Sequence, residues 1–183
     1  MKKWYCLLIV LLILHNAGAQ DILITKRGQV SFFSKTPLEN IDAQNNEVSS
    51  VLNKQNGEIV FAVLIKGFHF ERALMEEHFN ENYMESDKFP KSIFRGKVNN
   101  ITSVDIVKDG SYAVTADGDL TIHNITKKVN LSGTILVKAG QPELHCKFKI
   151  VLKDYNIQIP SLVADKIEET INVSVDCKYE AKK

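Results

Sequence analysis

The histidines are the residues of this chain best suited to binding a metal ion or moving a proton. Outside the N-terminal segment they are His69, His78, His123 and His145, and no two of them are closer than nine residues. Metal-binding histidines on a helix usually stand four residues apart. His123 follows an apolar residue at the end of a predicted strand, where a hydrogen-bonded structural role is the ordinary explanation. The sequence therefore predicts no metal site.

A nucleophile paired with a base is equally hard to find. No serine has the spacing of a nucleophile elbow, and neither Cys146 nor Cys177 has a convincing base partner in the sequence. Glu76 and Glu77 precede His78, but consecutive helical residues point in different directions and cannot converge on one substrate atom. We therefore predict a protein that is not an enzyme. The enzymatic alternative, a hydrolase or isomerase of small apolar substrates, would need a histidine beside a carboxylate inside a cavity.

The N-terminus has the parts of a secretory signal peptide. Two lysines precede an apolar run over residues 4–14, and Ala17-Gly18-Ala19 places small residues where a signal peptidase reads them. We predict that residues 1–19 are removed and that residues 20–183 form the mature, periplasmic or secreted domain. The apolar run is shorter than the roughly 20 residues of a transmembrane helix, so the protein is not expected to span a membrane.

Composition restricts the possible partners of the mature protein. The whole chain has 23 Lys and Arg against 22 Asp and Glu, and residues 1–19 contain two lysines and no acid, so the mature net charge is −1. Nucleic acid is held by clustered Lys and Arg, and this balance argues against it. The length fits one domain with a substantial core. A homodimer is left open.

Alternation of apolar and polar residues predicts antiparallel strands with one face inward. The predicted strands cover residues 22–25, 29–34, 58–66, 92–98, 101–108, 111–122, 128–138, 144–152 and 170–179. The predicted turn pairs are Asn56-Gly57, Asp109-Gly110, Asp117-Gly118 and Ala139-Gly140. Six or more strands joined by short turns indicate a mostly β domain, either a closed barrel or a sandwich. Periodicity alone does not choose between these two architectures.

Two stretches break the alternation. Over residues 70–84 the apolar residues recur at helical spacing, which predicts a helix that covers or plugs one end of a barrel. Over residues 154–165 apolar residues surround Pro160. This second stretch predicts either an irregular connection that helps to close a barrel mouth or a short extra strand.

The two cysteines of the mature chain fall on the last two predicted long strands. If Leu152 faces Ile171 in an antiparallel pair, then Cys146 faces Cys177. An exported protein permits disulfides, although the geometry between directly opposed residues is demanding. The alternatives are therefore a cross-strand disulfide, Cys146 to Cys177, or two small buried thiols.

Two segments of the chain together resemble the signature of the YceI-like family. They are Glu85-Ser86-Asp87-Lys88-Phe89-Pro90 and Gly118-Asp119-Leu120-Thr121-Ile122-His123-Asn124-Ile125-Thr126-Lys127-Lys128-Val129. Members of this family are secreted or periplasmic barrels that resemble lipocalins and bind isoprenoid-type lipids. The resemblance implies a single antiparallel, lipocalin-like closed barrel of about eight strands with one helical insert around residues 70–84. His123 and Thr126 belong to the second segment, and we predict that they hold a strand and a turn rather than contact a ligand.

The same resemblance implies a function and a pocket. The function is that of an exported binding protein that holds a long-chain apolar ligand, such as a polyisoprenoid, a quinone-type compound or a similar lipid, with no other cofactor. A packed interior is the alternative, in which case the protein would act through its surface in an envelope stress response or in protein interaction. The implied pocket lining is Val30, Phe32, Phe61, Val63, Ile65, Phe68, Met75, Phe79 and Phe94.

Overall fold

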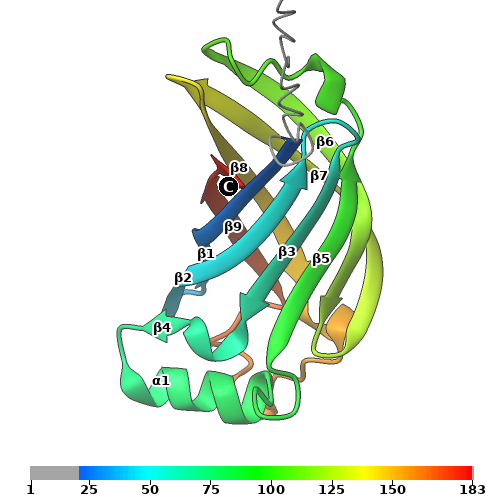
Figure 1. Ribbon diagram of the computed structural model, residues 1–183. Helices are drawn as coiled ribbons and strands as arrows, with labels where there is room; N and C mark the ends of the chain where they lie inside the picture. The colour runs from blue at the N-terminus through cyan, green and yellow to red at the C-terminus, as the bar shows by residue number, and fades with distance from the viewer. Residues whose placement is uncertain (1–20, 183) are drawn as a thin grey trace, which may run out of the picture.

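Long antiparallel strands make up most of the protein. The computed structural model describes residues 21–182, and the predicted signal peptide, residues 1–19, lies outside them. Figure 1 shows the strands wrapped around one interior, with a helix across the lower end. The long strands are β1 (Ile22–Lys35), β2 (Asn40–Asn53), β3 (Glu58–Leu64), β5 (Lys91–Val98), β6 (Gly110–Ile122), β7 (Ile125–Lys138), β8 (Gln141–Val151) and β9 (Thr170–Lys178).

These eight strands close into a barrel. Their order around the ring is β1, β9, β8, β7, β6, β5, β3, β2, and an antiparallel pairing of β1 with β2 joins the two ends of that order. Two short strands, β4 (His69–Phe70) and β10 (Glu180–Ala181), extend the sheet beside β2 and β1. Closure leaves no long strand with an unpaired edge. The predicted lipocalin-like closed barrel with one helical insert is confirmed.

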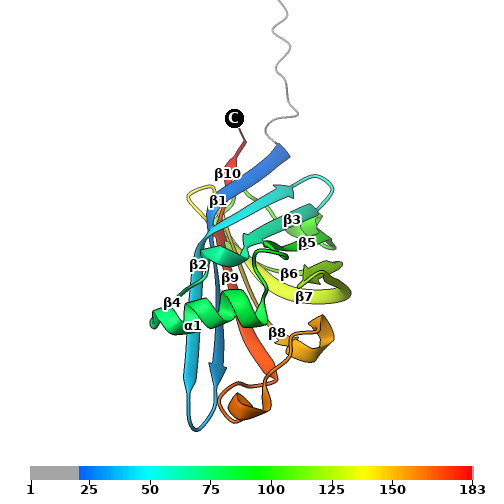
Figure 2. The ribbon, with the colours of Figure 1, turned by 90° about the horizontal axis from the view of Figure 1, so that it is seen from below.

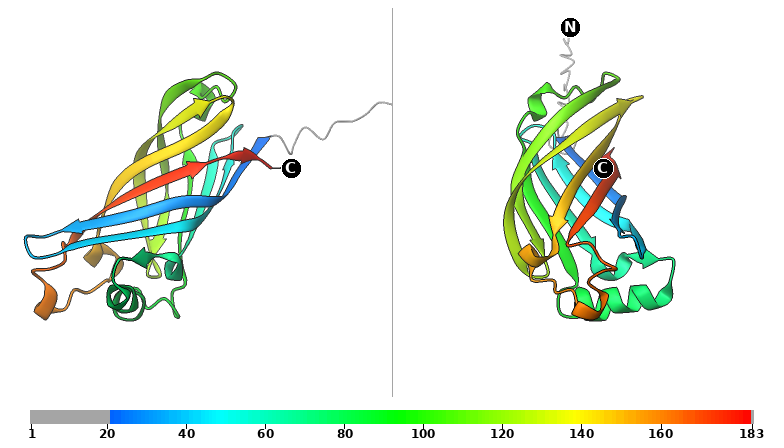
Figure 3. Two further views of the ribbon diagram at one scale, coloured as in Figure 1. Left: turned by 90° about the vertical axis from the view of Figure 1, so that its left-hand side faces the viewer. Right: turned by 180° about the vertical axis from the view of Figure 1, so that it is seen from behind.

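The helical insert and the irregular connection lie at the same end of the barrel. Helix α1 (Ala73–His78) continues into a π-helical turn, Phe79–Tyr83, and Figure 2 shows it crossing the barrel end. The connection from β8 to β9 contains two 3₁₀ turns, Leu152–Tyr155 and Ser161–Val163. It therefore takes the irregular form, and the alternative of an extra strand is wrong. Figure 3 shows this connection beside the tip of the β1–β2 hairpin.

Strand β2 has no counterpart among the predicted strands, because three of its five buried residues are polar or small. Ala43, Asn45 and Ser50 are buried there beside the apolar Val48 and Leu52. The Asn45 amide donates to the Leu64 carbonyl at 2.7 Å, which satisfies the buried polar group. A strand whose inward residues are polar does not show the apolar alternation on which the prediction rested.

Two other predicted strands also need correction. Residues 22–25 and 29–34 belong to the single strand β1, with a bulge at Gly28 that interrupts the apolar alternation. Residues 101–108 form a 3₁₀ turn, Ile101–Ser103, and irregular backbone. Asp105 accepts hydrogen bonds from the amides of Val107 and Lys108 at 3.0 and 3.3 Å, so this segment satisfies its backbone locally instead of pairing with a strand.

The predicted Asp117-Gly118 turn is wrong for a steric reason. Gly118 lies inside β6, opposite Gly96 of β5. A Cβ atom on Gly118 would stand 2.7 Å from the Phe94 ring. Glycine at this place thus makes room for an aromatic ring. By contrast, Ala139-Gly140 forms the two-residue turn between β7 and β8 as predicted, with φ of +50° and +71°.

Of the two alternatives for the cysteines, the Cys146–Cys177 disulfide is not formed. Cys146 lies opposite Val175 and Cys177 lies opposite Leu144, a register two residues away from the predicted one. Both thiols are free. Ile150 faces Ile171 and β8 ends at Val151, so the assumed pairing of Leu152 with Ile171 does not form. Burial raises the pKa of the Cys146 thiol to about 11 and that of Cys177 to about 12, which fits the alternative of two inert thiols.

Candidate binding cavity

The barrel is hollow. It encloses a cavity of about 520 Å³, and each of the eight barrel strands contributes at least one side chain to the lining. A packed interior was the alternative, and a void of several hundred cubic ångströms is within the range of ligand pockets. The chain has therefore kept space inside the ring that protein interiors normally fill.

All of the predicted lining residues border this cavity. They are Val30, Phe32, Phe61, Val63, Ile65, Phe68, Met75, Phe79 and Phe94. The resemblance to the YceI-like family implied this lining, and most of its residues lie on β1, β3 and β5 or in the helical insert. That they contact a ligand remains a prediction.

The opposite wall was absent from the predicted lining. Strands β6 to β9 contribute Val114, Ala116, Leu120, Leu131, Leu144, Cys146, Phe148, Ile150, Val173 and Val175, among others. Their inward positions follow the same period of two that predicted these strands. The alternation could have identified this wall, but the prediction favoured aromatic side chains over aliphatic ones.

An aromatic cluster attaches the helical insert to the barrel. Phe32 of β1 packs against Phe68, Phe70 and Phe79, with ring centroids 5.3, 5.8 and 5.5 Å apart. Phe79 also packs against Phe68 and Phe70 at 5.6 and 5.1 Å. These tilted and edge-on arrangements are favourable for aromatic pairs. The cluster lines the cavity at the end that α1 covers.

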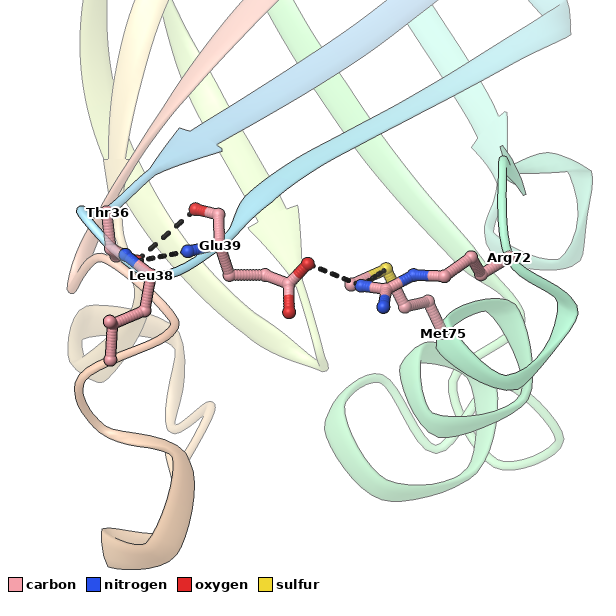
Figure 4. Close-up of polar contacts among 5 residues, drawn as sticks. All are labelled: Thr36, Leu38, Glu39, Arg72 and Met75. Atoms are coloured by element: carbon pink, nitrogen blue, oxygen red, sulfur yellow. Dashed lines mark hydrogen bonds and ion pairs between the residues drawn. The ribbon is translucent and has the colours of Figure 1, made fainter.

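The charged lining residues gather at the helical end. Glu39, at the tip of the β1–β2 hairpin, and Arg72, just before α1, form an ion pair with Oε1 and Nη2 2.5 Å apart. Thr36 shapes the tip, since its hydroxyl accepts from the amides of Leu38 and Glu39 at 3.3 and 3.1 Å. Figure 4 shows the Glu39 side chain reaching from the hairpin toward Arg72. This end, between the hairpin tip, α1 and the β8–β9 connection, is called the mouth below.

The two signature segments meet just outside the cavity. The His123 ring lies 3.0 Å, through Nε2, from a Glu85 carboxylate oxygen and 3.2 Å, through Nδ1, from the Tyr155 carbonyl oxygen. The Phe89 ring packs edge-on against it at 4.6 Å. The hydrogen bond from His123 lowers the pKa of the Glu85 carboxyl, and nearby Lys88 adds to this. Contacts of this kind tie three separate segments together and leave His123 outside the cavity lining.

The other predicted turn residue, Thr126, also makes a structural contact. Its hydroxyl shares a hydrogen bond of 2.8 Å with that of Thr121 across the β6–β7 hairpin. His123 and Asn124 form the two-residue turn of this hairpin, with φ of +48° and +61°, as a type I′ turn requires.

The remaining histidines do not assemble a catalytic or metal site in the part of the chain that the structure describes. His78 lines the cavity, and over residues 21–182 no carboxylate lies within 4.0 Å of it. His145 pairs with Asp176 at 2.5 Å on the exposed strand surface. Across the same residues, no three His, Cys, Asp or Glu side chains are placed to hold a metal ion. The described helices are each too short or too polar to cross a membrane.

Comparison with known proteins relates this architecture to solved structures. A polyisoprenoid-binding domain from Saccharophagus degradans, implicated in plant cell wall breakdown, is 13% identical, with a TM-score of 0.77, over 88% of this chain and 99% of that one. BcnA of Burkholderia cenocepacia is 10% identical, with a TM-score of 0.69, over 84% and 96%. The YceI protein of Campylobacter jejuni is 16% identical, with a TM-score of 0.59, over 75% and 84%. At such identities the likeness shows the fold alone.

Sequence comparison identifies the family. No curated protein matches the chain. The family described as the YceI-like domain matches residues 23–179, which is nearly the whole of the barrel. The chain therefore belongs to the YceI-like domain family.

Proposed function

We propose that this protein is an exported, non-enzymatic binder that holds a long-chain apolar ligand inside its barrel. The observation that carries the proposal is the cavity of about 520 Å³, whose lining is mostly apolar and has its charged residues near the mouth. Each methylene that a ligand buries there contributes about 0.8 kcal/mol. A long hydrocarbon chain therefore gains more from this cavity than a compact polar metabolite does.

The shape of the lining favours an elongated ligand. It runs from Ile59 and Val98 at one end of the barrel to Glu39 and Arg72 at the other. A polyisoprenoid or a similar lipid has the length and the apolar surface to fill such a space, and the Saccharophagus degradans relative is described as polyisoprenoid-binding. Export is supported by the signal-peptide pattern of residues 1–19.

The test begins with the protein as it occurs in the cell. Native mass spectrometry and lipid extraction of protein purified from its own envelope should reveal a bound apolar molecule. Recovery from the cytoplasm with residues 1–19 still attached would contradict export. Protein that carries nothing and binds no long-chain amphiphile after purification would contradict the binding function.

A pair of variants on β6 separates the cavity from the outer surface. Ala116 lines the cavity, and Ala113 of the same strand faces outward and is exposed. Ala116→Phe should place a ring in the void and abolish ligand binding, because the ligand and the ring compete for the same space. Ala113→Phe, the matched control, should leave binding unchanged. Equal binding by both variants would show that the ligand does not occupy the barrel.

A further inference from the structure

We propose that Arg72 binds an anionic oxygen head group, a carboxylate or a phosphate, at the polar end of the ligand. This inference rests on the proposed function and specifies which class of amphiphile the cavity accepts. It is carried by the placement of charge around the cavity and by the unused hydrogen-bonding capacity of one guanidinium group.

The charges fix the direction in which an amphiphile lies. The charged Asp, Glu, Lys and Arg residues of the lining are Glu39, Arg72 and Lys166, and all three lie at the mouth. The opposite end is lined by Ile59, Val98 and other apolar residues. Burying a polar head group among those side chains without a partner would be costly, so the head group must stay at the mouth.

Arg72 has donors to spare at that place. A guanidinium group carries five N–H donors on three nitrogens. Within residues 21–182, both side-chain contacts of Arg72 use Nη2, one to Glu39 at 2.5 Å and one to the Met75 sulfur at 3.3 Å. Figure 4 shows both contacts. Nε and Nη1 remain available, and a guanidinium group suits two-pronged binding of a carboxylate or phosphate.

The surrounding charges favour an anion. Glu39 neutralises Arg72, but Lys166 adds a second cation and forms no ion pair with any residue in the described range 21–182. Two acids of the neighbouring segments, which are not among the cavity-lining residues, are engaged by backbone amides: Glu76 accepts from the Phe70 amide at 3.2 Å and Glu168 from the Lys35 amide at 3.4 Å. The side chain of Arg72 is 56% exposed, so a head group can reach it from the mouth without entering the apolar interior.

Amphiphiles with one tail and different head groups test this assignment. Hexadecanoic acid, hexadecyl phosphate, hexadecanol and hexadecylamine are titrated against the delipidated protein by calorimetry. Because hydrogen bonds to a charged partner are about twice as strong as neutral ones, the acid and the phosphate should bind about tenfold more tightly than the alcohol, which corresponds to about 1.4 kcal/mol. The amine should bind most weakly.

Three variants locate the effect. Arg72→Gln should remove the preference for the anionic heads and leave the affinity for hexadecanol unchanged. Glu39→Gln should strengthen binding of the acid, since it removes a competing carboxylate. Arg95→Gln is the matched control, because Arg95 is exposed on β5 and outside the lining, and it should change nothing. Thermal unfolding of each variant confirms that the barrel is intact.

The outcomes separate this inference from the proposed function. If all four amphiphiles bind equally well, or if Arg72→Gln weakens hexadecanol as much as the acid, the head-group site is overturned while the binding function stands. If none of them binds, both fail. Inorganic phosphate is the tail-free control, and binding as tight as that of hexadecyl phosphate would indicate a free-anion site and overturn the assignment to a head group.

Discussion

The two ends of the barrel are built differently. At the end that carries β10, the Tyr179 side chain is 1% exposed, and its hydroxyl shares a hydrogen bond of 2.7 Å with Ser50. Leu52, which pairs with Leu23 of β1 at this end, is equally buried. At the mouth, neither α1 nor the π-helical turn after it contains a buried residue. One end is therefore a packed core, and the other is a cover over a void.

Stability and binding therefore depend on separate parts of the barrel: the end that carries β10 and the mouth. At the end that carries β10, the closed end, fully buried side chains stabilise the barrel through the apolar area that they remove from water. The mouth is held by the aromatic cluster and by the Glu39–Arg72 ion pair, and partly exposed ion pairs contribute little to stability. Segments with few buried contacts open most readily, which is the property that a binding cavity needs at its entrance.

Replacing a large side chain by alanine should lower the free energy of unfolding much more at the end that carries β10 than at the mouth. Tyr179→Ala removes a large buried ring and should lower the free energy of unfolding by about 3–5 kcal/mol, in line with other aromatic truncations in cores. Leu74→Ala, on α1 at the mouth, should lower it by less than about 0.5 kcal/mol, because Leu74 is 60% exposed. Urea unfolding measures both values.

If Tyr179→Ala and Leu74→Ala lower the free energy of unfolding equally, the two ends do not differ in their contribution to stability. A large loss from Leu74→Ala would show that the cover is part of the folding core. In that case the mouth could not open without unfolding of the barrel.

A smaller effect tests how the closed end accommodates its buried polar pair. Tyr179→Phe keeps the ring but leaves the buried Ser50 hydroxyl without its partner, which should cost about 1–3 kcal/mol. Adding Ser50→Ala should recover part of that loss, because no buried donor is then left unpaired. Equilibrium unfolding of the single and double variants gives the coupling energy. Strict additivity would show that the hydrogen bond does not stabilise this end.

The sequence was sufficient for the parts of the fold where apolar alternation is uninterrupted. Strands β5 to β9 and the inward faces of β8 and β9 follow from it directly. Strand β2 was missed because the polar residues Asn45 and Ser50 occupy inward positions. Asn45 finds its partner at Leu64 of β3, and Ser50 finds its partner at Tyr179, 129 residues away. The second partner comes close only when the ring has closed.

The candidate site, like the fold, was only partly predictable from the sequence. Phe32, Phe61 and Phe94 could be predicted as lining because large apolar residues at inward positions must face the interior. The Glu39–Arg72 pair could not, because 33 residues separate its members and neither lies in a recognisable motif. The strand register on which the disulfide alternative depended differs from the observed one by two residues. The alternating pattern cannot detect such a shift, because both registers keep the same faces inward.

The smallest expected effect concerns the contact between the signature segments beside the mouth. The pKa of Glu85 is lowered below its ordinary value of 4.5, chiefly by the hydrogen bond from His123. The ionised form is thus favoured in the folded protein, so its stabilising effect is present at neutral pH and is lost as the pH falls below 4.5 and through the lowered pKa. Glu85→Gln should unfold at a slightly lower temperature than the wild type at pH 7, and the two melting temperatures should converge in acid. A difference that persists unchanged at low pH would show that the Glu85 charge does not help to hold the mouth.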